Sequence, residues 1–139
     1  MQKPVTILVC LALGLSAATP LFDFETKEEA KAWKLRTASD GLIRTSMYAS
    51  AGEYSLCFRT PKYKKGMEQW PAFEAVPPLH DWRGYDRLVI DVVNPTAETP
   101  FFSFICSDNK VPFREGLRFN LPLPACGFRR FVIPLSGFP

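Results

Sequence analysis

The stretch DWRGYDRLVIDVVNP, residues 81–95, constrains the fold more than any other part of the chain. A polar turn containing one glycine leads into a run of aliphatic residues, which an Asn-Pro pair ends. Leu88, Ile90 and Val92 share one face of an extended chain, while Asp91 interrupts the other face. This pattern predicts a strand buried strongly on one side and partly on the other, as in a protein of two packed β-sheets.

Similar short apolar segments, separated by turn residues, run along most of the chain. We expect strands or extended segments at residues 21–24, 42–48, 54–59, 70–76, 101–107, 113–121 and 128–135. Thr26 and Glu29 fit a capping box, which predicts a short helix through about Trp33. About seven or eight short strands with one minor helix predict an all-β fold, an antiparallel two-sheet β-sandwich.

The N-terminus has the pattern of an export signal. Lys3 supplies a positive start, an apolar core runs from Val5 to Leu15, and small residues follow up to Ala18. This order predicts a secretory signal peptide over residues 1–18, with the folded domain at residues 19–139. A membrane anchor is the alternative, but the apolar run is shorter than the roughly 20 residues that span a bilayer. We therefore expect a secreted, periplasmic or cell-surface protein without a stable membrane span.

At the C-terminus, the segment from Phe131 to Leu135 has the pattern of a strand that runs into a turn, and the sequence ends at Pro139. We expect a β-sandwich ending there to lack its closing strand. The chain would then be the N-terminal part of a longer polypeptide. A natural terminus is the alternative.

Charge and cysteine content exclude some classes of function. Without Lys3 the formal charge falls from +3 to +2, and the basic residues are scattered, so a nucleic-acid partner is not expected. Cys57, Cys106 and Cys126 follow the signal, an odd number for an exported protein. Cys106 and Cys126 lie on neighbouring expected strands and could pair. Because the chain has one histidine and no Cys-x-x-Cys, a zinc site is not expected.

The order of short motifs along the chain resembles a known group. These motifs are LFDFE at 21–25, GEYSL at 52–56, WP at 70–71, DWRGYD at 81–86 with its strand and Asn-Pro, and IPL at 133–135. The set is similar to the galactose-binding-like jelly-roll modules of secreted bacterial proteins, among them the carbohydrate-binding modules that accompany glycoside hydrolases. The resemblance implies a jelly-roll topology, a closing strand beyond the last one seen here, and saccharide binding on a concave sheet or in end loops.

The resemblance also implies a structural calcium ion between the first strand, the loop before Tyr54 and an acidic residue of the closing strand. Glu25, Gly52 and Glu53 stand at the matching places. Calcium takes six to eight oxygen ligands, so this chain supplies only part of such a site.

Saccharide binding needs flat aromatic surfaces beside polar side chains. The candidates are Tyr63 and Trp70 as platforms, with Arg59, Glu68, Arg118 and Asn120 as polar partners. A core position for Trp70 and simple solvation of the two arginines are the alternatives. Trp82 and Tyr85 are expected to pack at the corner before the central strand. The Phe101-Phe102 pair straddles both faces at the start of a strand and is expected to be core.

Catalytic signatures are weak. Asp81 and Asp86 flank a turn and are expected to cap it, while His80 has no nucleophile motif near it. The sequence therefore predicts a non-catalytic carbohydrate-binding or accessory module, with a polysaccharide or glycan and a C-terminal catalytic domain of the same polypeptide as partners. The alternatives are a structural sandwich that packs against a catalytic domain, or a small glycoside hydrolase.

Overall fold

The computed structural model describes residues 5–14, 19–36, 41–60, 63–67, 69–107 and 115–136, with the backbone alone up to Thr19. Within these ranges the chain is mostly β, its strands pair antiparallel, and its one helix is short. The prediction of an all-β chain with a minor N-terminal helix is therefore confirmed for the described residues. The expected turn at residues 108–110 lies outside them.

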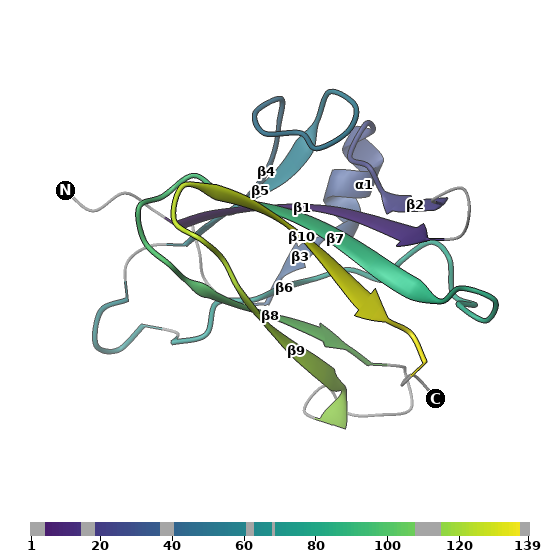
Figure 1. Ribbon diagram of the computed structural model, residues 1–139. Helices are drawn as coiled ribbons and strands as arrows, with labels where there is room; N and C mark the ends of the chain where they lie inside the picture. Colours follow the sequence, from purple (N-terminus) through teal and green to yellow (C-terminus); the bar gives the residue numbers. More distant parts are fainter. Residues whose placement is uncertain are drawn as a thin grey trace.

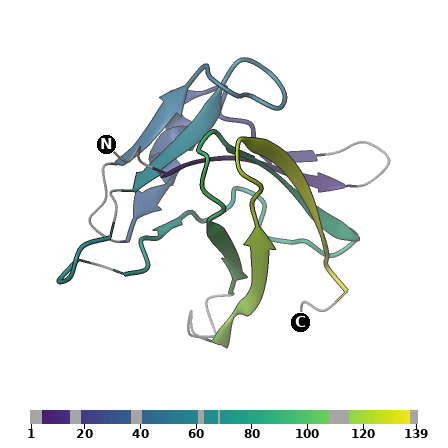
Figure 2. The same cartoon turned by 60° about the vertical axis from the view of Figure 1, so that its left-hand side comes forward.

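The largest sheet has the strand order β10-β7-β1-β5-β4, and β2 pairs with β1 off this path (Figure 1). Its strands are β1 (Val5–Gly14), β2 (Thr19–Phe22), β4 (Gly41–Thr45), β5 (Ser55–Thr60), β7 (Arg87–Asn94) and β10 (Gly127–Pro134). Two smaller sheets pair β3 (Lys34–Leu35) with β6 (Phe73–Glu74) and β8 (Phe101–Cys106) with β9 (Leu117–Pro122). Figure 2 shows β8 and β9 below the large sheet, in a second layer.

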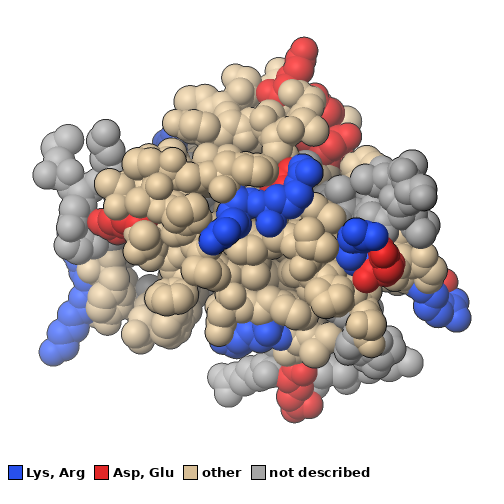
Figure 3. All heavy atoms as spheres, in the orientation of Figure 1, with Lys and Arg blue, Asp and Glu red and all other residues tan. Residues whose placement is uncertain are grey.

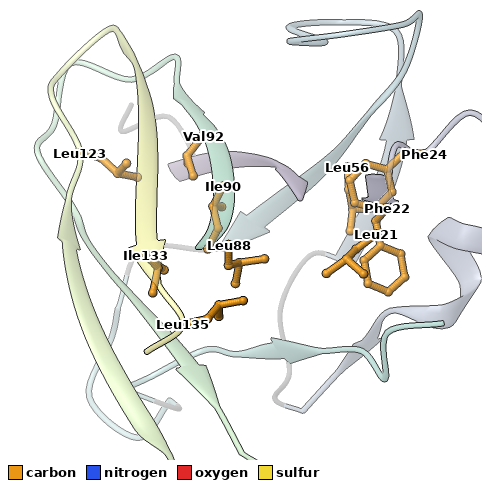
Figure 4. Close-up of a cluster of buried hydrophobic side chains, with 10 residues drawn as sticks. All are labelled: Leu21, Phe22, Phe24, Leu56, Leu88, Ile90, Val92, Leu123, Ile133 and Leu135. Atoms are coloured by element: carbon orange, nitrogen blue, oxygen red, sulfur yellow. The ribbon is translucent and has the colours of Figure 1, made fainter. Parts of the chain in front are cut away.

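The core forms on the face of β7 that its alternating aliphatic residues predict. Leu88, Ile90 and Val92 have no exposed surface. They belong to one cluster with Leu21, Phe22, Phe24, Leu56, Leu123, Ile133 and Leu135 (Figure 4). Burying one such side chain stabilises the fold by roughly 1.5–3 kcal/mol. The same cluster contacts half-buried aromatic side chains of β8 and β9, which attaches the small sheet to the large one.

Asp91 lies on the other face of β7, where its carboxylate is buried. Its side chain is 7% exposed, and both carboxylate oxygens accept hydrogen bonds from Arg130 at 2.7 Å. Arg130 lies directly opposite Asp91 in the pairing of β10 with β7. A bidentate arginine offsets part of the desolvation of the carboxylate, which explains how an acid interrupts a buried strand.

The short helix α1 (Lys27–Ala32) begins as the capping box predicts. Thr26 Oγ1 accepts the backbone N–H of Glu29 at 3.3 Å. The reciprocal hydrogen bond of the capping box would come from the backbone N–H of Thr26. Instead, Glu29 Oε2 accepts the backbone N–H of Phe24, two residues earlier, at 2.7 Å. Burial, followed by the neighbouring carboxyl of Asp23, raises the pKa of Glu29. The helix ends at Trp33, whose ring packs edge-on against Phe22 at 5.1 Å between centroids.

The segment expected to be an export signal lies in the middle of the large sheet. Its residues Val5–Gly14 form β1, which pairs with β5 on one side and with β7 on the other. The expected cleavage point near Ala18 falls outside the described residues. The export signal therefore stays a prediction.

Candidate functional site

The outer face of the β8–β9 pair carries the residues best suited to bind a ligand. Phe101 lies opposite Pro122, Ser103 opposite Asn120, and Ile105 opposite Arg118. Alternation along each strand turns Phe102, Phe104 and Phe119 to the core, where they contact the hydrophobic cluster. The alternate residues of both strands therefore share the opposite face.

This outer face combines one aromatic ring with hydrogen-bonding side chains. Phe101 is 81% exposed, the largest fraction among the exposed large hydrophobic residues that the structure describes. Ser103 follows Phe101 by two residues on β8, and its Oγ donates a hydrogen bond to Oδ1 of Asn120 on β9 at 2.8 Å. Arg118 lies two residues before Asn120 on the same face of β9. Its side chain is exposed and forms no ion pair with any described residue. The face therefore offers a flat apolar surface, amide and hydroxyl groups, and one cation.

Asn94 helps to hold the chain around this face. It has no exposed surface and ends β7. Its Nδ2 donates to the carbonyls of Glu98 at 2.7 Å and Pro124 at 2.9 Å. Its Oδ1 accepts the N–H and the hydroxyl of Thr96. These bonds join the segment before β8 to the turn after β9, so a residue that the sequence marks only as a strand stop also positions the small sheet.

The five expected saccharide residues that the structure describes do not form one site. Arg118 and Asn120 share the outer face of β9, as the alternation predicts. Tyr63 and Trp70 lie in the segment between β5 and β6, 55% and 74% exposed. Both views place this teal segment to one side of β8 and β9 (Figures 1 and 2).

Arg59 stands near the end of β5, half-buried, and Glu68 lies outside the described residues. The core position considered for Trp70 is wrong, because most of its surface is exposed.

Phe101 is the residue that sequence reasoning missed. A core position was expected for both residues of the Phe-Phe pair, but consecutive strand residues point to opposite faces, so one of them must turn outward. Phe102 packs against the core as expected, and Phe101 does not. The signal that could have separated them is the spacing, since Phe101 shares its face with Ser103 rather than with Phe102 and Phe104.

The expected calcium residues meet, but as a hydrogen-bonded corner. Glu25 Oε1 accepts the backbone N–H groups of Glu53 at 2.8 Å and Tyr54 at 3.1 Å. Gly52 has φ +67°, and a Cβ there would overlap the Glu25 carboxylate. Backbone N–H groups attract an anion and repel a cation, so their approach to Glu25 does not suit calcium.

The guanidinium of Arg44 donates hydrogen bonds to two backbone carbonyl oxygens of the same corner. Arg44 Nε donates to Phe24 O and its Nη2 to Glu25 O, both at 2.6 Å, and its Cζ lies 3.2 Å from the centre of the Tyr54 ring. Phe24 has φ +63°, a left-handed conformation that costs a non-glycine residue about 1–2 kcal/mol. No group of three or more His, Cys, Asp or Glu residues that could hold a metal occurs in the described ranges. In the residues that the structure describes, protein donors therefore already bind Glu25 Oε1 and the carbonyl oxygens of this corner, and the calcium ion stays a prediction.

The turn before β7 is structural, as expected. Asp81 Oδ1 accepts the N–H of Arg83 at 3.0 Å and Trp82 Nε1 donates to Leu79 O at 2.8 Å. The side-chain hydrogen bonds from Arg83 lower the pKa of Asp81 to about 2. Asp86 does not cap the turn but pairs with Arg87, whose side-chain hydrogen bonds lower the pKa of Asp86.

The three described cysteines are free thiols, so the pairing considered for Cys106 and Cys126 is not formed. Cys57 is buried, which confirms its expected role as a small packed residue. Burial raises the pKa of the Cys106 thiol to about 11. Cys126 is exposed and its Sγ donates to Thr96 O at 3.4 Å. None of these contacts arranges a thiol with a base for nucleophilic chemistry.

Neither a known protein family, nor a curated protein, nor a solved structure matches this chain. In the described part of the chain, no helix has the length and apolar character needed to cross a bilayer. Figure 3 shows one streak of basic side chains across the centre of the face that it draws and other basic side chains that lie apart from it. The outer face of β8 and β9 is therefore assigned on its own chemistry.

Proposed function

We propose that this chain is an exported, non-catalytic carbohydrate-binding module with a jelly-roll β-sandwich fold, and that its saccharide site is the outer face of β8 and β9. The observation that carries the proposal is the exposure of Phe101 on the same face as Asn120 and Arg118. The module would belong to a longer secreted or cell-surface polypeptide that acts on polysaccharide.

The chemistry of this face matches a sugar ring. A pyranose presents C–H groups on one side, which pack against an aromatic ring, and hydroxyl groups at its edge, which exchange hydrogen bonds with amides and guanidinium groups. Phe101 supplies the ring, while Asn120 and Arg118 supply the donors. Ser103 holds the amide of Asn120 in place through its hydrogen bond.

Weak affinity is expected for such a face. One side of the Phe101 ring offers about 80 Å² of apolar surface, which is worth about 2 kcal/mol at 25 cal/mol per Å². Two or three hydrogen bonds add about 1 kcal/mol each, so a total of about 4–5 kcal/mol gives a dissociation constant of roughly 0.2–1 mM for one sugar unit. A polysaccharide that contacts the face with several units would bind more tightly.

Affinity electrophoresis against a panel of soluble plant, algal and bacterial polysaccharides tests the proposal. We expect retarded migration of the protein in at least one polysaccharide, and weaker retardation of the Phe101→Ala variant. Unchanged migration of the exported protein in every member of the panel would contradict saccharide binding.

A second candidate is a structural role against a neighbouring domain. Phe128 and Val132 of β10 are both more than half exposed, and each is aligned with a half-buried valine of β7, so the edge of the large sheet carries two apolar spots, one on each side of the Arg130–Asp91 pair. Under this candidate, charged substitutions at these two positions would lower the stability of the full-length protein. Phe101→Ala would then leave both stability and polysaccharide migration unchanged.

A further inference from the structure

Strand β1 occupies a place that the large sheet cannot leave open. Residues Val5 to Val9 align with Leu56 to Thr60 of β5, and residues Leu8 to Gly14 align with Arg87 to Val93 of β7. Because β1 lies between them, β5 and β7 do not pair with each other. Without β1 the sheet would be divided into two parts.

Both neighbours of β1 are core strands. Leu56 of β5 is 2% exposed, and three side chains of β7 have no exposed surface. Backbone N–H and C=O groups in such strands require hydrogen-bond partners, because water does not reach a packed core. An open position between β5 and β7 would leave one edge of each strand without them.

The sequence of β1 is the one that the signal-peptide pattern assigns for removal. Thr19, the first residue after the expected cleavage, begins β2, and β2 pairs with Leu11 to Leu13 of β1. Cleavage would therefore remove the partner of three strands at once. An exported protein with this fold must fill the same position with another strand.

We propose that the position between β5 and β7 is a strand-acceptor site, and that in the exported protein it holds a β-strand from the part of the same polypeptide that follows residue 139. The inference rests on the export and the longer polypeptide of the proposed function, and is independent of saccharide binding. We define this acceptor site by its two borders, Leu56–Thr60 and Arg87–Val93.

The end of β10 lies close to the acceptor site. Pro134 and Gly14 are both aligned with Arg87, on its two opposite sides. The N–H of Leu135 donates to Asp86 O at 2.9 Å, which holds the chain at this end of β7. Two strand spacings, roughly 10 Å, separate β10 from the acceptor site, a gap that about three extended residues span. A continuing chain that enters the site at this end runs in the opposite direction to β1, parallel to β5 and β7, and it reaches the site without crossing the core, which favours an intramolecular strand.

The borders also define the sequence of the strand that fits. Leu88, Ile90 and Val92 face the core and are aligned with Leu13, Leu11 and Val9 of β1. A replacing strand therefore needs apolar residues at every second position. The intervening positions face the side of Asp91 and accept polar residues. Seven residues or so would cover the border on β7.

Photo-crosslinking of the complete polypeptide, purified after export, tests this assignment. Val93 lies opposite Leu8, which in turn lies opposite Cys57, so a probe at position 93 is about 5 Å from the central residue of the occupying strand. Val93 is replaced by p-benzoylphenylalanine, and the cross-linked peptide is identified by mass spectrometry. The matched control carries the same probe at Val132, on the outermost strand β10.

We expect the N-terminus at Thr19 and, from position 93 alone, a cross-link to an alternating apolar segment beyond residue 139. A cross-link to Val5–Gly14 would overturn the assignment by showing that the expected signal is a permanent strand, and a cross-link to another protein would overturn the intramolecular source. If the probe disturbs folding, hydrogen exchange of the unsubstituted protein measures whether the backbone amides of β5 and β7 are protected. Protection of the β5 and β7 amides is expected, and free exchange of both borders would overturn the proposal. Saccharide binding is measured separately, so its loss with an intact cross-link would refute the saccharide site alone.

Discussion

Replacing Phe101 and Phe102 one at a time separates binding from folding at neighbouring positions. The two rings belong to the same strand and point to opposite sides of it. Phe101 is 81% exposed, while Phe102 packs against the hydrophobic cluster. Phe101→Ala should therefore reduce saccharide affinity with little change in the free energy of unfolding, and Phe102→Ala should destabilise the fold.

The magnitudes follow from the buried areas. A phenylalanine side chain buries about 200 Å² when it is fully enclosed, so the covered fifth of Phe101 is about 40 Å², or about 1 kcal/mol. Loss of a stacked sugar face of about 80 Å² is worth about 2 kcal/mol, a factor of roughly 30 in the dissociation constant. Removing the half-buried ring of Phe102 should cost about 2–4 kcal/mol, toward the lower part of the range for core aromatic residues.

Urea unfolding followed by tryptophan fluorescence gives the stability, and titration calorimetry with the polysaccharide selected by electrophoresis gives the affinity. Each variant is the control for the other, because the chemical change is identical. Phe101→Ala with unchanged affinity would refute the stacking role. Destabilisation by Phe101→Ala as large as that by Phe102→Ala would refute the assigned strand faces.

Three electrostatic predictions test the rest of the fold. Arg44→Lys should lower the free energy of unfolding by about 1–3 kcal/mol in urea, because one ammonium cannot reproduce two guanidinium hydrogen bonds and the stacking on tyrosine; equal stability would show that this corner does not need the guanidinium. Arg130→Ala should cost about 1–3 kcal/mol by leaving Asp91 buried without its bidentate partner, and Arg130→Ala in an Asp91→Asn background should cost less, as a double-mutant cycle would measure. An NMR titration should place the pKa of Asp81 at about 2 instead of its ordinary 3.8, and Arg83→Ala should return it toward that value. Because the folded pKa is depressed, this pair stabilises the fold above about pH 3.8 and loses its effect as the pH falls to about 2; a wild-type titration at 3.8 would show that the pair does not form in solution.

The parts of the fold that the sequence predicts are those governed by local periodicity. Alternation places Leu88, Ile90 and Val92 in the core and puts Arg118 and Asn120 on one outer face. Residues that act within their own turn or helix end, such as the capping threonine of α1, are also predicted, because their hydrogen bonds span only a few positions.

The parts that it misses depend on contacts between distant segments. Arg44 reaches the corner after β2 from some 20 positions along the chain, and Asn94 joins two turns across some 30 positions. The sequence near Arg44 and Asn94 does not indicate these distant hydrogen-bond partners. The Phe101 and Phe102 pair shows a different limit, since composition marks both as core residues, and the face that Phe101 shares with Ser103 becomes clear once β8 pairs with β9. For Val5–Gly14 the export signal stays a prediction, while the structure places the backbone of this segment between two strands of the sheet.

The most direct measurement of the central claim is an NMR titration of the isotope-labelled exported protein with an oligosaccharide of the polysaccharide that it binds. We expect the largest amide and side-chain shifts on Phe101, Ser103, Arg118 and Asn120, and we expect them to saturate together at one dissociation constant. Shifts confined to the segment that holds Tyr63 and Trp70, with the β8 and β9 signals unmoved, would contradict this expectation.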